Sequence, residues 1–198
     1  MSSSGDDCTN LQQCFGMMSG GDTLIIRDGV YTGDVNRIYS GNHPPAGPSR
    51  SSPTTLQAEN VGEVFFDGQN TRQMFQFLGV GGGTSYLSNW NFVGLQWVNS
   101  VSYGIELTGG TTASDFTTGD YGSSLPNAYI KFKNCGFHGE DNSVQLAYMK
   151  YILFEDCWTW GNGRYGYNLY LNDHVIVRRN VDRRDAAHSG GSVPTHFG

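Results

Sequence analysis

Five arginines near the end of the chain are the residues best suited to chemistry on an acidic substrate. The five are Arg164, Arg178, Arg179, Arg183 and Arg184. An arginine guanidinium binds a carboxylate through two parallel hydrogen bonds, so such a cluster can hold an acidic ligand. Arg164 and Arg179, together with His138, are therefore the candidate catalytic residues. The alternative is that the arginines pair with nearby aspartates such as Asp156 and Asp182, and such exposed pairs contribute little free energy.

Polar residues also recur at one position of four short alternating segments, MFQFL, GIELT, SVQLA and GYNLY. If these segments stack at the spacing of neighbouring strands, about 4.8 Å, their polar side chains form a line that can bind successive sugars. An aromatic ring and a guanidinium nearby would extend such a site. The candidate substrate-binding residues are Gln76, Glu106, Gln145, Asn168, Tyr170 and Arg178. The alternative is that these positions are polar because they face water.

Glu140 and Asp141 are the candidate metal ligands, because adjacent carboxylates can hold calcium. His138 lies close by in the sequence and could act as a general base near neutral pH. Calcium is the one cofactor that these residues suggest. A glycoside hydrolase would instead need two carboxylates facing one groove about 5–10 Å apart, and Glu106 and Glu155 are the candidates for that reaction.

Composition and charge exclude several classes of protein. The formal net charge is −6 and the sequence pI is about 5.2, so we expect no nucleic-acid partner. No apolar run approaches the roughly 18 residues that a membrane span requires. The four cysteines form no Cys-x-x-Cys pair, which argues against a structural zinc site. We expect a Cys8–Cys14 disulfide, as suits an exported protein, and buried thiols at Cys135 and Cys157.

An internal repeat predicts the elements that would position these residues. YIKFKNCGF (129–137) aligns with YILFEDCWT (151–159), and HVIVRRNVD (174–182) follows with the same apolar columns. NWNFVGLQW, EVFFDGQN and DTLIIRDGVYTG are looser, earlier copies. A unit of about 22 residues cannot bury its own apolar face, so the units must stack on one another. This predicts an all-β fold, a parallel β-solenoid. An up-and-down barrel is the competing architecture, but it would not need matching columns.

The whole chain, residues 1–198, is predicted to form a single solenoid domain. Residues 7–20 have helical spacing of apolar side chains, and we expect a short helix there that caps the first coil. Residues 39–53 and 109–126 fit no column and are predicted to project as loops. The last residues read as the middle of a turn, so we expect a fragment of a longer solenoid. An uncapped end could also associate end to end with another copy.

The segment SGGDTLIIRDGVYTG resembles the opening coil of pectate-lyase-like right-handed parallel β-helices. TTLQAENVGEVFFDGQ and YLSNWNFVGLQWVN are similar to coils of the alginate lyase and chondroitinase B type, and the later repeats look like generic parallel β-helix repeats. The resemblance implies a right-handed parallel β-helix that is secreted or displayed at the cell surface. It also implies a groove for an acidic polysaccharide, β-elimination by basic residues, and often calcium. The Asn-Gly-x-Glu stretch of the alginate lyase type does not occur in this sequence.

We therefore expect an extracellular protein that binds or degrades a polysaccharide, with β-elimination on a uronate polymer as the leading reaction. The alternative is a non-catalytic solenoid with a structural, adhesive or filament-forming role.

Overall fold

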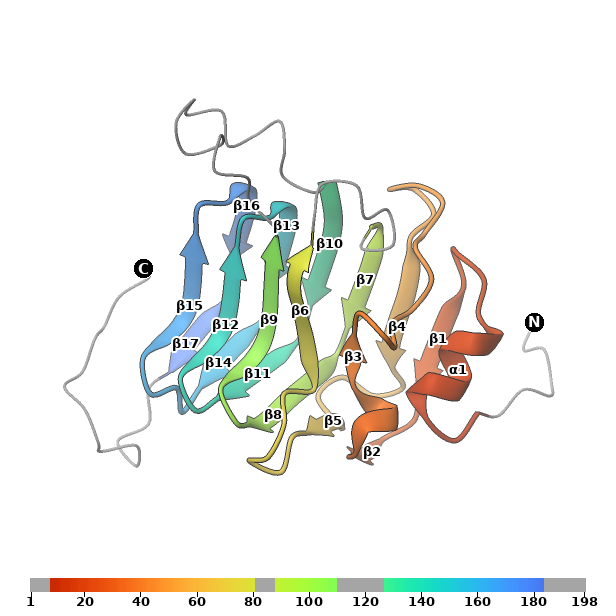
Figure 1. Cartoon of the computed structure of the whole chain (residues 1–198), viewed down its shortest axis with the longest axis horizontal. Coiled ribbons are helices and arrows are strands. Elements are labelled where there is room, and N and C mark those ends of the chain that lie inside the picture. The colour runs from red at the N-terminus through yellow and green to blue at the C-terminus, as the bar shows by residue number, and fades with distance from the viewer. Residues whose placement is uncertain (1–7, 81–87, 110–126, 184–198) are drawn as a thin grey trace.

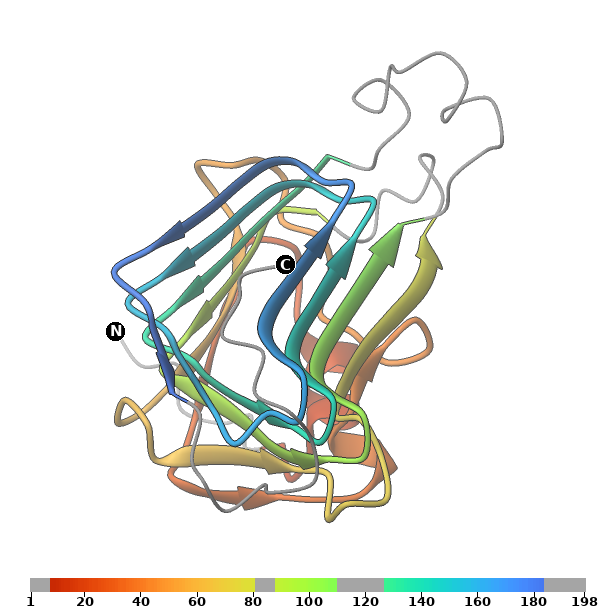
Figure 2. The ribbon, with the colours of Figure 1, turned by 90° about the vertical axis from the view of Figure 1, so that its left-hand side faces the viewer.

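The computed structural model describes residues 8–80, 88–109 and 127–183, which form an all-β, right-handed parallel β-helix. Three parallel sheets make up the sides of the coil, as Figures 1 and 2 show. Sheet A contains β1 (Thr23–Ile26), β4 (Thr54–Ala58), β7 (Trp90–Val93), β10 (Asn127–Lys133), β13 (Lys150–Glu155) and β16 (Asp173–Arg178). Sheet B contains β2 (Gly29–Tyr31), β5 (Val64–Asp67), β8 (Leu95–Ser100), β11 (Gly136–Gly139), β14 (Trp158–Trp160) and β17 (Val181–Arg183). Sheet C contains β3 (Ile38–Tyr39), β6 (Phe75–Val80), β9 (Tyr103–Gly109), β12 (Asn142–Ala147) and β15 (Tyr165–Tyr170).

The register of the strands confirms the predicted repeat. Ile130 of β10 lies opposite Ile152 of β13, which lies opposite Val175 of β16. Each coil visits sheets A, B and C in turn before the next coil begins, so equivalent residues of successive coils become neighbours. The columns read from the sequence are therefore physical columns, and they run along the axis of the solenoid.

Stacked aromatic side chains fill the interior of the coil. Phe132 lies between Phe92 and Phe154, with ring centroids 5.0 Å away on each side and interplanar angles of 14° and 5°. A second stack places Trp97 against Phe137 at 5.7 Å and 11°. All five side chains are fully buried. Burial of each contributes roughly 1.5–3 kcal/mol, and each ring pair adds about 0.5–1.5 kcal/mol.

The buried polar column beside this core carries two thiols. Cys135 and Cys157 are buried and unpaired, and their Sγ atoms lie 3.5 Å and 3.4 Å from the carbonyl oxygens of Phe92 and Phe132. Burial raises the pKa of the Cys135 thiol well above its usual value, so this group stays protonated at neutral pH. Asn180 occupies the same column one coil later and accepts a hydrogen bond from the Cys157 backbone N–H at 2.8 Å.

The corners of the coil use the left-handed backbone region at equivalent positions. Asn89, Tyr129, Tyr151 and His174 have φ values of 59°, 47°, 61° and 53° at the corner that leads into sheet A. Outside glycine and asparagine this conformation carries a steric cost of roughly 1–2 kcal/mol per residue. Its repetition in coil after coil indicates that the packed strands on either side impose it.

A short helix lies at the first coil. Helix α1 covers Leu11–Met17, a shorter span than the expected 7–20, because Asn10 is already extended and caps it by accepting a hydrogen bond from Gln13 N–H at 2.9 Å. At the other end, Met18 returns to extended backbone. A disulfide joins Cys8 to Cys14 across the start of the helix. In the described residues, no helix has the length and apolar character needed to cross a membrane.

Of the two expected loops, the first lies within the described residues and most of the second lies outside them. The segment between β3 and β4, residues 40–53, leaves the coil as an excursion beside sheet A (Figure 1). Of the expected loop 109–126, Gly109 is the last residue of β9, and residues 110–126 lie outside the described residues.

Candidate binding groove

The predicted polar line on sheet C exists, but its side chains bind one another. Glu106 lies opposite both Gln76 and Gln145, and Gln145 lies opposite Asn168. Gln76 Nε2 donates to Glu106 Oε2 at 2.9 Å, and Asn168 Nδ2 donates to Gln145 Oε1 at 2.8 Å. Gln73 adds a second donor to Glu106, which is only 8% exposed. This ladder links neighbouring coils and leaves few hydrogen-bonding groups for a ligand.

Two of the predicted arginines are ion-paired with carboxylates of the preceding coil. Arg179 Nε lies 2.7 Å from Asp156 Oδ1, and an Arg178 nitrogen lies 2.9 Å from Glu155 Oε1. The Arg179 hydrogen bonds hold the pKa of both Glu155 and Asp156 below their ordinary values, outweighing partial desolvation. The alternative interpretation of these arginines, pairing between coils, therefore describes their geometry.

The remaining predicted residues of this region lie apart from one another. Arg164 stacks over its neighbour Tyr165, with the guanidinium carbon 4.9 Å from the ring centroid. Tyr170 is 51% exposed at the end of β15 and makes an edge contact with Tyr148 at 5.5 Å. Arg183 ends β17, and Arg184 lies outside the described residues. Of the four described arginines of the sequence cluster, Arg178 and Arg179 share the carboxylate of Glu155, whereas Arg164 and Arg183 belong to other segments of the coil.

The metal candidates lack further ligands in the described residues, and the hydrolase candidates lie on different sheets. Glu140 and Asp141 lie on the turn between β11 and β12, and across the described ranges no group of three or more His, Cys, Asp or Glu side chains could hold a metal ion. Glu106 belongs to sheet C and Glu155 to sheet A, so these two carboxylates do not face one groove. His138 lies on β11 of sheet B, whereas Arg164 follows β14 and Arg179 follows β16.

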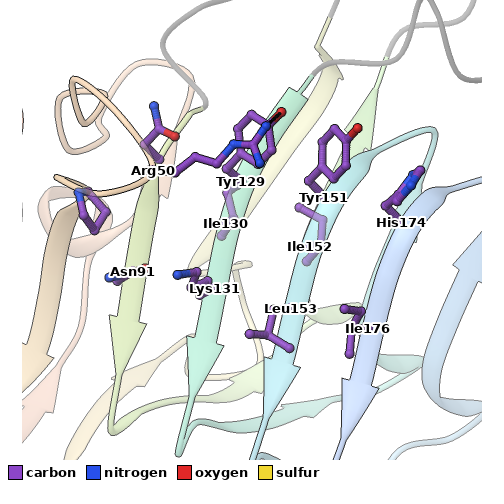
Figure 3. A pocket seen from close by; sticks show the side chains of 12 residues that line it. Arg50, Asn91, Tyr129, Ile130, Lys131, Tyr151, Ile152, Leu153, His174 and Ile176 are labelled. Atoms are coloured by element: carbon purple, nitrogen blue, oxygen red, sulfur yellow. Dashed lines mark hydrogen bonds between the residues drawn. The ribbon is translucent and has the colours of Figure 1, made fainter.

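A groove of about 290 Å³ crosses the outer face of sheet A (Figure 3). Its walls come from the left-handed residues at or near the start of each strand and from the outward side chains of the strands. Leu153 and Ile176 give it an apolar floor. The polar and aromatic residues that line it are Arg50, Asn89, Asn91, Tyr129, Lys131, Tyr151 and His174.

An external ladder of rings forms one side of this groove. Tyr129 and Tyr151 stack with centroids 4.6 Å apart and planes 15° apart, and His174 follows Tyr151 at 4.8 Å and 41°. The repeated left-handed corner gives these three side chains the same direction, and the strand spacing sets their separation. Arg50, from the 40–53 excursion, places its guanidinium carbon 3.7 Å from the Tyr129 ring centroid and donates a hydrogen bond to the Tyr129 hydroxyl.

The groove has a basic character. Arg50 and Lys131 have no carboxylate partner among residues 8–80, 88–109 and 127–183. At the far end, Asp173 contacts both Lys150 Nζ at 3.3 Å and His174 Nδ1 at 2.5 Å. Partial desolvation would raise the pKa of Asp173, but the hydrogen bonds from Lys150 and His174 outweigh it, and the pKa lies below its ordinary value. Among the described residues, Arg50 and Lys131 line the groove, no carboxylate does, and the nearby Asp173 is already paired.

Two buried acceptors in the groove have no donor. The side-chain oxygens of Asn89 and Asn91 are buried without a hydrogen-bond partner in the described part of the chain. Leaving a buried acceptor unsatisfied costs about 1–3 kcal/mol, so a donor from outside the chain, either water or a ligand group, would be favourable at both atoms.

The sequence contained a signal for part of this groove. Tyr129, Tyr151 and His174 stand in the aligned repeats, one position before the first inward column. A column with two tyrosines and a histidine at an outward corner is a sign of a ring ladder. Arg50 had no such signal, because it reaches Tyr129 across 79 positions of sequence.

Comparison with known proteins agrees with this architecture. A family model described as the right-handed β-helix region matches residues 81–191, which is more than half of the 198 residues. Neither among curated proteins nor among solved structures does a protein match this chain. The resemblance to pectate-lyase-like proteins is thus supported at the level of the fold. With its three parallel sheets and its matched coils, the chain belongs to the right-handed β-helix family.

Proposed function

We propose that this β-helix binds an acidic polysaccharide along the groove of sheet A. The observation that carries the proposal is the ladder of Tyr129, Tyr151 and His174, with the guanidinium of Arg50 lying over its first ring. The C–H faces of sugar rings pack on aromatic rings, and successive rungs of the ladder would contact successive parts of one chain.

The charges in the groove favour a uronate over a neutral sugar. Arg50 already contacts the ladder and has no carboxylate partner in the described residues, so a ligand carboxylate would supply that partner. Lys131 offers a second cation one strand away from Asn91. Both side chains are exposed, so their attraction for an anion should weaken as the salt concentration rises.

The unsatisfied oxygens of Asn89 and Asn91 supply the complementary acceptors. Sugar hydroxyl groups are donors, and they would satisfy both oxygens when the chain lies over the floor formed by Leu153 and Ile176. A polyuronate offers both chemical groups that the groove needs, hydroxyls and carboxylates, on every residue.

The same groove holds the groups that β-elimination requires, and we propose that reaction as its second candidate function. Arg50 would pair with the uronate carboxylate and acidify the neighbouring C5–H. His174, held at Nδ1 by Asp173, would accept that proton at Nε2. The C5–H electrons would form the C4=C5 double bond while the C4–O bond breaks, and the Tyr151 hydroxyl would protonate the leaving oxygen.

We also propose that the protein works outside the cell, either secreted or at the cell surface. The Cys8–Cys14 disulfide supports this location, because disulfides persist in oxidising compartments.

Direct binding measurements test the proposal. Calorimetry with polygalacturonate, alginate and chondroitin sulfate should give binding to at least one polymer, and Tyr151→Ala should weaken it about tenfold, equivalent to about 1.4 kcal/mol. Tyr170→Ala is the matched control, since Tyr170 is an exposed tyrosine on a different sheet. Absorbance from an unsaturated product would support β-elimination as well as binding. Binding without that absorbance would support a carbohydrate-binding role alone. If none of the three polymers binds, the proposal is wrong and a structural or adhesive solenoid becomes the better interpretation.

A further inference from the structure

A second groove, of about 460 Å³, lies on the outer face of sheet B. It runs across the strands from β2 and β5 to β14, and it shares no lining residue with the groove of sheet A. We propose that this second groove binds a neutral, hydroxyl-rich saccharide chain. The proposal does not depend on the function proposed for sheet A, because other residues carry it.

The strand register builds this groove as an outward column. Asp67 on β5 lies opposite Val98 on β8, and His138 on β11 and Trp160 on β14 continue the same side of the sheet. From β5 to β14 there are three strand-to-strand steps, so the column is about 14 Å long. A groove of that length accommodates a short oligosaccharide that lies along the axis of the solenoid.

Two stacked rings provide a platform at one end. The His138 and Trp160 rings lie 5.6 Å apart with planes inclined by 23°. Asn99 fixes the imidazole by donating its backbone N–H to His138 Nδ1 at 3.2 Å. Both rings are partly exposed, and Phe65 and the 64% exposed Val30 extend the apolar surface beside them. Such a surface fits the C–H face of a sugar ring.

A fixed carboxylate provides the polar end. Asp67 Oδ1 accepts hydrogen bonds from Gln69 N–H at 2.7 Å and from Asn99 Nδ2 at 3.0 Å. Its Oδ2 has no partner in the part of the chain that the structure describes. A carboxylate held in this way can accept hydrogen bonds from a pair of neighbouring sugar hydroxyls without losing conformational entropy on binding.

Charge decides between neutral and acidic sugars. None of the described residues that line the second groove is a lysine or arginine, and no ion pair within that part of the chain neutralises the negative charge of Asp67. A uronate carboxylate would meet this charge in a partly apolar setting, where repulsion between like charges is strongest. Hydroxyl groups meet no such penalty, so the ligand chemistry that fits is a neutral saccharide.

Calorimetry with three neutral hexasaccharides, β-1,4-linked glucose, mannose and xylose, tests this inference on the whole protein. We expect at least one of them to bind. Trp160→Ala should weaken that binding at least tenfold, and Asp67→Asn should weaken it several-fold because the amide keeps only one acceptor. Tyr170→Ala is the control for loss of an exposed ring, and Tyr151→Ala is the control for the other groove; both should bind as the wild type does.

The outcomes are distinct. Absence of binding to all three hexasaccharides, or equal binding by Trp160→Ala and the wild type, would overturn the inference. If Trp160→Ala unfolds, as circular dichroism would reveal, Trp160→Phe keeps a smaller ring and should retain part of the affinity. Failure of polyuronate binding together with intact hexasaccharide binding would contradict the function proposed for sheet A and leave this inference standing.

Discussion

The two grooves differ in chemistry although the same coils build them. The groove of sheet A joins two tyrosines and a histidine to Arg50 and Lys131, which have no carboxylate partner in the described residues. The groove of sheet B joins a tryptophan and a histidine to the lone carboxylate of Asp67. Both ring sets sit on strands that advance by the same step, so the fold sets the spacing of the rings and the outward residues set the chemistry of each groove.

Inward and outward side chains of the same repeat have different roles. Inward columns such as Phe92, Phe132 and Phe154 hold the coils together and are almost uniformly apolar. Outward side chains do not fill the core, so neighbouring sheets can present opposite charges within one solenoid. The comparison predicts that a core substitution lowers the affinity of both grooves for their ligands. A substitution of an outward residue should lower the affinity of one groove only.

The largest effect should come from the shared core. Phe132→Ala removes a ring stacked on both sides and should lower the free energy of unfolding by about 3–5 kcal/mol, which urea unfolding would measure. Both grooves should lose affinity together, because the coils that align their rings become mobile. Leu78→Ala, at a side chain that is 60% exposed, should change stability little. A core variant that impaired one groove only would contradict the shared-scaffold interpretation.

Removing one ring from each groove should change the affinities for the two ligands independently. Tyr151→Ala should reduce polyuronate affinity about tenfold and leave neutral hexasaccharide affinity unchanged, and Trp160→Ala should do the reverse. Calorimetry of both variants with both ligands measures the four affinities. Loss of both affinities in either variant, with the fold intact, would mean that the grooves are coupled or are not separate sites.

Charge should matter for sheet A and not for sheet B. Arg50→Gln and Lys131→Gln should each reduce polyuronate affinity several-fold, and raised salt should weaken wild-type polyuronate binding while leaving hexasaccharide binding unchanged. Lys133→Gln is a matched control, because Lys133 is exposed on the same strand as Lys131 but does not line the groove. An equal effect of Lys133→Gln would indicate general charge attraction and no specific contact.

The smallest effect should come from the arginines outside both grooves. Folded-state pKa values of Glu155 and Asp156 are lowered, so their ion pairs stabilise the fold above the unfolded pKa values near about 4 and lose this contribution as pH falls through the folded values. Arg179→Ala should thus lower the Tm slightly at pH 7, and the difference from wild type should vanish on acidification. Binding in both grooves should stay unchanged, which calorimetry would check.

The sequence predicted the fold well because the inward columns are readable. A solenoid needs equivalent apolar residues in register, and the alignment of residues 129–137, 151–159 and 174–182 supplied them. The polar line of Gln76, Glu106, Gln145 and Asn168 was also placed correctly on one face.

The candidate site was harder to predict for two physical reasons. A polar column can bind a ligand or bind itself, and the geometry that decides this, such as Gln76 donating to Glu106, depends on rotamers that the sequence does not contain. The position of Arg50 depends on the path of an irregular excursion with no repeat to align. A sequence column carries no information on which outward face is hollow, so the grooves required the structure.

The left-handed corner that carries Tyr129, Tyr151 and His174 has a consequence for the length of the ligand. The coils of β10, β13 and β16 each contribute one rung, and the rungs advance by one strand step of about 4.8 Å. The reach of the protein along a polymer is therefore counted in coils: duplicating one repeat would lengthen the contact by one rung, and deleting one would shorten it by the same amount, without redesign of any side chain.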